Sequence, residues 1–164
     1  MKQESKALVT GAAEKVAAFV SACERELTAE VVNGYLCDGF AELCRALNGL
    51  RTEDSDRDAL VVAKRMEDSL MALDGCVVRV LGRRGREPQR SFRRAALIVG
   101  SVFKPGAFSA DKVPPVWKGK VTPETYRQMV IDRVCEAIRA PLVWLRDELR
   151  SCEMKGERLV CGMV

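Results

Sequence analysis

Apolar side chains recur at intervals of three and four residues along most of this chain, which is the spacing of one face of an α-helix. Residues 5–27 follow this pattern, with charged residues at the positions between. A second helix is expected over 29–48, because Thr28 is a good N-cap and the apolar positions continue beyond it. Gly34 and Gly39 lie inside this helix. Since an internal glycine costs about 1 kcal/mol relative to alanine, we expect both glycines to permit the close approach of a neighbour.

The middle of the chain predicts a third helix, a segment of ambiguous type and a fourth helix. The third helix covers about 58–73 and ends at the Asp-Gly pair at 74–75. The β-branched run at 76–81 fits either a strand or a helix, since short apolar runs do not distinguish the two. The fourth helix begins near Pro88, which a first turn tolerates, and stops before Pro105. It is apolar on nearly every side, so we expect a central helix buried by its neighbours.

The last third of the chain predicts a loop followed by a long helix. Residues 104–121 contain prolines, glycines and charged residues in no helical order, and are expected to form a loop. Thr122 is a suitable N-cap, and Pro123 is a suitable first residue for the helix that follows. This helix should extend to about Cys152, with a kink or a split at Pro141, because an internal proline removes a backbone hydrogen bond.

Composition supports a single folded domain. The chain of 164 residues is 48% apolar and 30% charged, as is typical of a globular protein. It shows no internal repeat and no apolar run of the about 18 residues that a membrane span requires. We therefore expect one all-α domain over 1–164, a bundle of six to eight helices around the central apolar helix, with 153–164 as a flexible C-terminal tail.

Histidine does not occur in the chain. The commonest general base and the commonest metal ligand are therefore missing, as are the Ser-His and Cys-His nucleophile pairs. The Gly-Arg-Arg-Gly stretch at 82–85 lacks the Lys-Ser/Thr of a phosphate-binding loop. We expect no enzymatic activity, no metal and no cofactor.

Seven cysteines are scattered along the chain without a CxxC pair. Their odd number, together with an N-terminus that does not resemble a signal peptide, predicts reduced thiols in an intracellular, cytoplasmic protein. Most of them should be buried as small apolar residues. Cys161 is the one expected to be exposed, and its pairing with a second molecule is left open.

Positive charge is concentrated in one segment, since residues 79–94 hold seven arginines and a single acid, Glu87. Such a cluster could contact phosphates, form a solvated connection, or contain one arginine with a specific role. Phe92 is the only aromatic residue within the cluster, so base stacking has little support.

Three segments resemble motifs of the Bcl-2 family of apoptosis regulators. Residues 91–103 are similar to the BH1 region, in which an aromatic residue and an arginine open a central helix; Phe92 and Arg94 stand at those places. Residues 141–148 resemble the start of BH2, with a tryptophan between apolar and acidic neighbours. Residues 36–40 resemble a BH3 core, and residues 66–70 form a second, competing BH3-like stretch.

The resemblance implies a Bcl-2-like fold and an inhibitor of apoptosis that sequesters BH3 helices of pro-apoptotic proteins in an apolar surface groove. It is closer to the viral members of the family, which implies action in a host cell. Arg94 would pair with the aspartate of the BH3 helix. The implied groove residues are Arg94, Phe92, Leu97, Phe40, Leu43, Leu47, Val62, Met66 and Leu70, and those of the BH2-like segment are Trp144 and Leu145.

Two other functions stay open beside this one. The first is a small basic helical nucleic-acid-binding protein that uses Arg83, Arg84, Arg86 and Arg90. The second is a helical structural protein that only self-associates, and the exposed groove of a Bcl-2-like protein would also permit a homodimer. A location in the cytoplasm, peripheral to mitochondria, follows from the resemblance. Nucleic-acid binding, the less favoured partner, would weaken steeply with salt.

Overall fold

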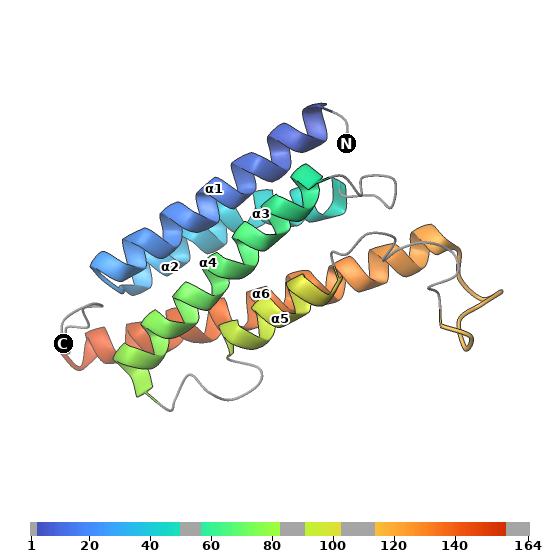
Figure 1. Ribbon diagram of the computed structural model, residues 1–164. Helices are drawn as coiled ribbons and strands as arrows, with labels where there is room; N and C mark the ends of the chain where they lie inside the picture. The colour runs from blue at the N-terminus through green and yellow to red at the C-terminus, as the bar shows by residue number, and fades with distance from the viewer. Residues whose placement is uncertain (1–2, 50–56, 83–90, 103–113, 157–164) are drawn as a thin grey trace.

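The computed structural model describes residues 3–49, 57–82, 91–102 and 114–156 of the chain. Within these ranges every regular element is an α-helix and no strand occurs, so the expectation of an all-α protein with six to eight helices is confirmed (Figure 1). The helices are α1 (Gln3–Arg25), α2 (Ala29–Cys37), α3 (Gly39–Gly49), α4 (Arg57–Leu81), α5 (Phe92–Val102) and α6 (Pro123–Met154).

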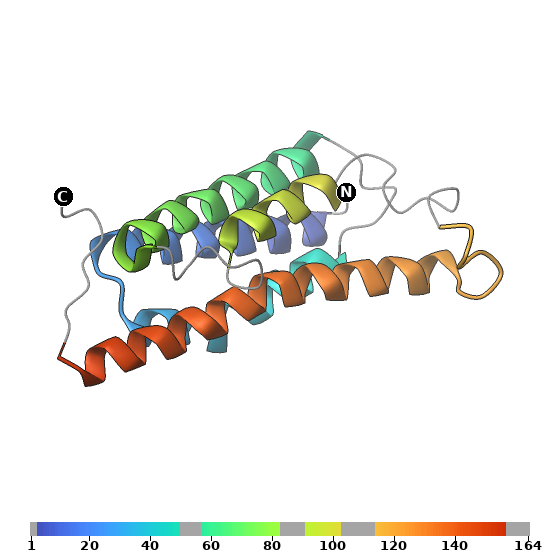
Figure 2. The same ribbon diagram turned by 90° about the horizontal axis from the view of Figure 1, so that it is seen from below.

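The helices form two layers (Figure 2). One layer contains α1, α4 and α5, and the other contains α2, α3 and α6. The core lies where α1 packs on α3 and where α5 packs on α6. Large side chains from both layers are fully buried there, among them Leu27, Leu47, Met66, Leu73, Phe92, Ile131 and Leu145.

The expected helix over 29–48 is two helices in the structure, separated at Asp38, whose backbone is not helical (φ −127°, ψ −72°). Gly39, which follows the break, lies close to a neighbouring side chain. A Cβ at this position would lie 2.5 Å from ring atoms of Tyr35, and that ring is stacked on Phe19 with 4.3 Å between the centroids. The close approach expected at Gly39 is therefore confirmed. Gly34 has no atom within 4 Å of such a Cβ, so the same expectation is wrong there.

Helix α4 continues through the Asp-Gly pair at 74–75, where the sequence predicted its end. The ambiguous segment 76–81 is helical as well. Two features explain the continuation. Cys76, Val77 and Leu81 are buried, and this packing outweighs the weak helix propensity of Asp and Gly. The Asp74 carboxylate, moreover, serves a different helix, because its Oδ1 accepts the Arg93 backbone N–H at 3.3 Å.

Helix α5 is not buried on nearly every side, so the prediction of a central apolar helix is wrong. It packs against α4 and α6, but its outer side faces solvent, and the Leu97 side chain is 57% exposed. Its expected start near Pro88 lies outside the described residues. The run of apolar residues indicated burial on all sides, but only one face of the helix reaches the core. That face consists of Phe92, Ala95, Ala96 and Val99.

Helix α6 begins as the sequence predicted. Thr122 is the N-cap, and its Oγ1 accepts the Thr125 backbone N–H at 3.1 Å. Pro123 stands in the first turn. The predicted split at Pro141 does not occur, and the helix runs on to Met154. Packing of α6 on α2, α3 and α5 offsets the hydrogen bond that this proline removes.

The expected loop and tail are described only in part. Of residues 104–121, the part 114–121 consists of turns and the remainder lies outside the described residues. Of residues 153–164, the first two belong to α6, so the expected tail starts too early; 157–164 lie outside the described residues. None of the described helices combines the length and the apolarity needed to cross a bilayer.

Candidate helix-binding surface

The N-terminus of α5 is fixed by two side chains. Ser91 acts as its cap, since Ser91 Oγ accepts the Arg94 backbone N–H at 3.1 Å. The Asp74 carboxylate of α4 accepts the neighbouring N–H of Arg93 and places a negative charge at the positive end of the helix. The direction in which Arg94 leaves the bundle is therefore set by contacts with both the preceding residue Ser91 and α4.

Phe92 and Arg94 point to opposite sides of α5. Phe92 is fully buried in the core, whereas Arg94 is exposed. Among the described residues, the Arg94 guanidinium has no acidic partner and no hydrogen bond. No acidic side chain in the described part of the chain therefore competes with a ligand for this guanidinium.

An apolar pair lies close to Arg94. Helices α4 and α5 run antiparallel, because Asp74 contacts Arg93 while Glu67 approaches Gly100, where a Cβ would lie 2.7 Å from Glu67 Oε2. Leu97 of α5 falls between these two contacts, and so does Met71 of α4. Both are exposed, Leu97 by 57% and Met71 by 39%. We call the surface formed by Arg93, Arg94, Leu97 and Met71 the α4–α5 surface.

The charges of α4 beside this surface pair among themselves. Lys64 Nζ lies 3.2 Å from Asp68 Oδ1 and 4.0 Å from Glu67 Oε2. The hydrogen bond to Asp68, with the charges of Asp68 and Glu67, raises the pKa of Lys64. Such exposed pairs add little stability. At the arginine end of the α4–α5 surface, Asp74 accepts the Arg93 backbone N–H, and no described acid forms an ion pair with the side chain of Arg93 or Arg94.

The structure places the predicted groove residues in three groups. Of those whose side chains are described, Arg94 and Leu97 alone are open to solvent. Phe40 and Trp144 are half-buried, and the side chain of Val62 lies outside the described residues. The others are buried and can meet a partner only if helices separate; they are Phe92, Leu43, Leu47, Met66, Leu70 and Leu145.

The BH3-like and BH2-like segments do not add open surface. Residues 36–40 cross the break between α2 and α3, so they do not form one continuous helix. Residues 66–70 lie in α4 with both apolar ends buried. Residues 141–148 lie in the interior of α6. The three segments that resemble Bcl-2 motifs therefore differ from one another in helix position and in burial.

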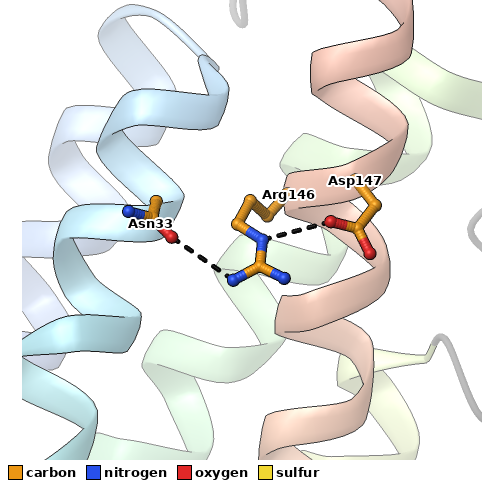
Figure 3. Close-up of polar contacts among 3 residues, drawn as sticks. All are labelled: Asn33, Arg146 and Asp147. Atoms are coloured by element: carbon orange, nitrogen blue, oxygen red, sulfur yellow. Dashed lines mark hydrogen bonds and ion pairs between the residues drawn. The ribbon is translucent and has the colours of Figure 1, made fainter.

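Arg146, inside the BH2-like segment, is bound within the molecule (Figure 3). Its Nη1 donates to Asn33 Oδ1 of α2 at 3.3 Å, and its Nε donates to Asp147 Oδ1 at 3.1 Å. A second polar link joins the same helices, because the Ala29 backbone N–H donates to Glu153 Oε1 at 3.0 Å. Neither link could be predicted from the sequence, since nothing local marks residues so far apart as partners.

A second side-chain cluster joins α3 to α6. Cys44 of α3 and Cys135 of α6 are half-buried thiols, and their interaction lowers the pKa of Cys44 and raises that of Cys135. Next to them, the Arg127 guanidinium donates to the Asn48 carbonyl at the end of α3, and the Asn48 amide donates to the Cys44 carbonyl at 2.8 Å. These contacts hold the C-terminal end of α3 on α6.

The expectation of reduced thiols holds for four of the described cysteines, Cys23, Cys37, Cys44 and Cys135. It is wrong for Cys76, which is buried and disulfide-bonded. Cys23, Cys76 and Cys152 are buried as expected, whereas Cys44 and Cys135 are half-buried and Cys37 is exposed. Cys161 lies outside the described residues.

Two other kinds of site were considered from the sequence, a metal site and a nucleic-acid-binding cluster of arginines. In the described part of the chain, no set of three or more Cys, Asp and Glu side chains could hold a metal ion. The arginines of the nucleic-acid alternative, Arg83, Arg84, Arg86 and Arg90, lie outside the described residues. Comparisons of the chain with protein-family models, with curated proteins and with solved structures found no match.

Proposed function

We propose that this protein is an inhibitor of apoptosis of the Bcl-2 type, which sequesters BH3 helices of pro-apoptotic proteins at the α4–α5 surface. The observation that carries the proposal is Arg94, which is exposed, lacks an acidic partner among the described residues and lies one helical turn from the exposed Leu97. The protein would act by binding rather than by catalysis, in the cytoplasm or at mitochondria of a host cell.

The chemistry of a BH3 helix fits this surface. An amphipathic helix presents apolar anchors three, four and seven residues apart, and a BH3 helix adds an aspartate. Leu97 and Met71 offer apolar contact, and Arg94 offers the bidentate donor that recognises a carboxylate. An arginine also fixes the orientation in which the helix docks.

The side chains that are exposed on the α4–α5 surface offer too little binding free energy for micromolar affinity, so further apolar side chains must become accessible on binding. Burying a large apolar side chain completely contributes about 1.5–3 kcal/mol, and Leu97 and Met71 are already partly covered. A hydrogen bond to a charged group adds about 1.5–3 kcal/mol. Micromolar affinity requires roughly 8 kcal/mol after the losses of association. We therefore propose that α4 and α5 move apart from the core on binding, so that Met66, Leu70 and Phe92 also contact the ligand.

Titration calorimetry with a panel of BH3 peptides tests the proposal. At least one peptide should bind with an affinity that changes little between low and high salt, because apolar contacts dominate. A lack of binding by every peptide at high micromolar concentration would overturn the proposal.

A nucleic-acid-binding function is the second candidate, and the observation that favours it is the side-by-side exposure of Arg93 and Arg94. Binding to a DNA or RNA oligonucleotide should then weaken steeply as salt is raised, because released counterions drive phosphate contacts. The same titrations, repeated with an oligonucleotide, separate the two candidates. If the protein forms a homodimer through the α4–α5 surface, diluting the protein alone in the calorimeter should produce a heat of dissociation.

A further inference from the structure

Residues 114–121, directly before α6, carry exposed apolar side chains that the proposed function does not use, and we call this segment the Trp117 turn. Val116 is 65% exposed and Trp117 is 37% exposed. Every residue from Pro115 to Lys120 is exposed. Figures 1 and 2 show the segment at the N-terminal end of α6, which extends beyond the other helices. Both apolar side chains thus lie at one end of the molecule, away from the core.

The backbone of the Trp117 turn is held by its own hydrogen bonds. The Trp117 N–H donates to the Pro114 carbonyl at 2.9 Å, and the Lys120 N–H donates to the Trp117 carbonyl at 3.0 Å. Gly119, the third residue of the second of these turns, has a φ of 80°, as a type II turn requires at that position. Thr122 then caps α6. Because the segment is already ordered, little conformational entropy is lost when it binds a partner.

Two lysines in the Trp117 turn, Lys118 and Lys120, add positive charge beside these apolar side chains. Both are exposed, and neither forms an ion pair with an acid among the described residues. The nearest acid in the sequence is Glu124, which lies in the first turn of α6, where its charge also meets the positive end of the helix. The turn therefore combines two apolar side chains with two cations that have no acidic partner in the described part of the chain.

We propose that the Trp117 turn docks on the surface of a lipid bilayer that contains anionic phospholipids. Tryptophan is enriched at membrane–water interfaces, because its ring is apolar while its N–H donates to polar headgroups. Val116 adds apolar area beside it. The apolar stems of Lys118 and Lys120 let their ammonium groups reach the lipid phosphates. Each lysine near an anionic surface raises the affinity about five-fold.

The size of the Trp117 turn favours a bilayer over a protein as its partner. A stable protein–protein interface buries roughly 800 Å² on each partner, which is more than a turn of this length offers. Insertion at a bilayer surface needs only a few amphipathic side chains together with electrostatic attraction. The contact should be reversible, and salt should weaken it by screening the lysines.

The test measures co-sedimentation of the full-length protein with vesicles of phosphatidylcholine and phosphatidylserine, and with vesicles of phosphatidylcholine alone. We expect binding to the mixed vesicles and much less to the neutral ones. Changing Lys118→Gln together with Lys120→Gln should weaken binding roughly twenty-fold. Arg150→Gln together with Lys155→Gln is the matched control, because it removes the same charge from exposed positions at the other end of α6. This control variant should bind like wild type.

Fluorescence identifies the side chain that enters the bilayer. The chain has two tryptophans, and Trp144 is half-buried on α6. Brominated lipids in the mixed vesicles should quench the wild-type emission. Trp117→Phe keeps an apolar ring, so it should still bind, but the emission of its remaining tryptophan should not be quenched. Trp117→Ala should bind roughly five-fold more weakly or worse, because the apolar contact is lost.

Three outcomes would overturn the proposal. The first is a lack of binding to the mixed vesicles, and the second is binding that the change of both lysines leaves intact. The third is binding without quenching of Trp117, which would mean that other cations such as Arg93 and Arg94 make the contact. Because the Trp117 turn is separate from the α4–α5 surface, these results bear on the membrane contact alone.

Discussion

Arg94 and Arg146 lie in the two segments that resemble BH1 and BH2, and their surroundings in the folded protein are opposite. Arg146 is three-quarters buried as a side chain (25% exposed) and is hydrogen-bonded to Asn33 of α2 and to Asp147. Arg94 is exposed on α5 and has no partner among the described residues. One arginine has its acceptor on another helix, and the other has none in the part of the chain that the structure describes.

The difference teaches that an arginine in a motif-like segment is a candidate for binding only when the fold leaves it without an acceptor. Both arginines can form charge-assisted hydrogen bonds. Arg146 already uses this capacity to join α6 to α2, so it supports the structure. Arg94 retains it for a ligand. The α4–α5 surface is accordingly the better candidate site. The contact between α2 and α6 stabilises the layer on which α5 packs.

The largest expected effect comes from the inner face of α5. Phe92→Ala should lower the free energy of unfolding by about 3–5 kcal/mol, because it leaves a cavity under a fully buried ring. Leu97→Ala, the matched change on the outer face, should alter it by less than about 0.5 kcal/mol. Urea unfolding measures both. Equal losses would mean that α5 has no free outer face.

In the layer that contains α2, α3 and α6, packing depends on the close approach of Gly39 to the Tyr35 ring. Gly39→Ala should lower the free energy of unfolding by roughly 1–3 kcal/mol, because the added Cβ would clash with the Tyr35 ring, which is fixed by its stack on Phe19. Gly100→Ala is the control, since its Cβ would meet only the movable carboxylate of Glu67. Thermal unfolding of the two variants should differ clearly; similar melting temperatures would contradict a tight contact between Gly39 and the Tyr35 ring.

The free energy of unfolding should decrease at alkaline pH, because the thiol of Cys23 is buried. Burial, then the charge of Glu24, raises the pKa of Cys23 from 9.0 to about 12 in the folded state. A raised pKa means that stability is complete below pH 9 and is lost as pH rises from 9 towards 12; at pH 10 the loss is about 1 kcal/mol. Urea titrations at pH 8 and pH 10 measure it. The Cys23→Ala variant should lose less, with the remainder due to groups such as Tyr35, whose pKa burial also raises.

The two arginines themselves give the smallest effect on stability. Arg146→Ala should lower the free energy of unfolding by about 1 kcal/mol, the scale of a hydrogen bond at a partly buried site. Asn33→Ala should lower it by a similar amount, and the double variant by less than the sum, because both changes remove the same contact. Arg94→Ala should leave stability unchanged. A loss for Arg94→Ala as large as for Arg146→Ala would show that Arg94 has an internal partner.

Local features of the fold could be predicted from the sequence, and tertiary ones could not. The N-caps Thr28 and Thr122 act within a few residues of their own helices, so their positions were predicted correctly. The Asp-Gly pair at 74–75 predicted a helix end, but Asp74 caps α5 instead, which only the packing of α5 on α4 determines. The close approach of Gly39 to the ring of Tyr35, beside the break between α2 and α3, is likewise a feature of packing.

The candidate site was predictable to a similar extent. Arg94 could be singled out from the sequence because it opens an apolar helix after a run of arginines. That Leu97 is exposed while Phe92, Met66 and Leu70 are buried depends on which face of each helix the neighbours cover. The partner of Arg146 lies on another helix, so the sequence offers no signal that distinguishes this arginine from Arg94.

The central claim is that Arg94 binds the aspartate of a BH3 helix, and a double-mutant cycle tests it most directly. Calorimetry would measure the affinity of wild type and Arg94→Ala for a BH3 peptide and for the same peptide with its aspartate replaced by alanine, with the exposed Arg45→Ala as the control. We expect a coupling of about 1–3 kcal/mol between Arg94 and the aspartate, and none for Arg45. A coupling of zero for Arg94, with the peptide still bound, would contradict the account.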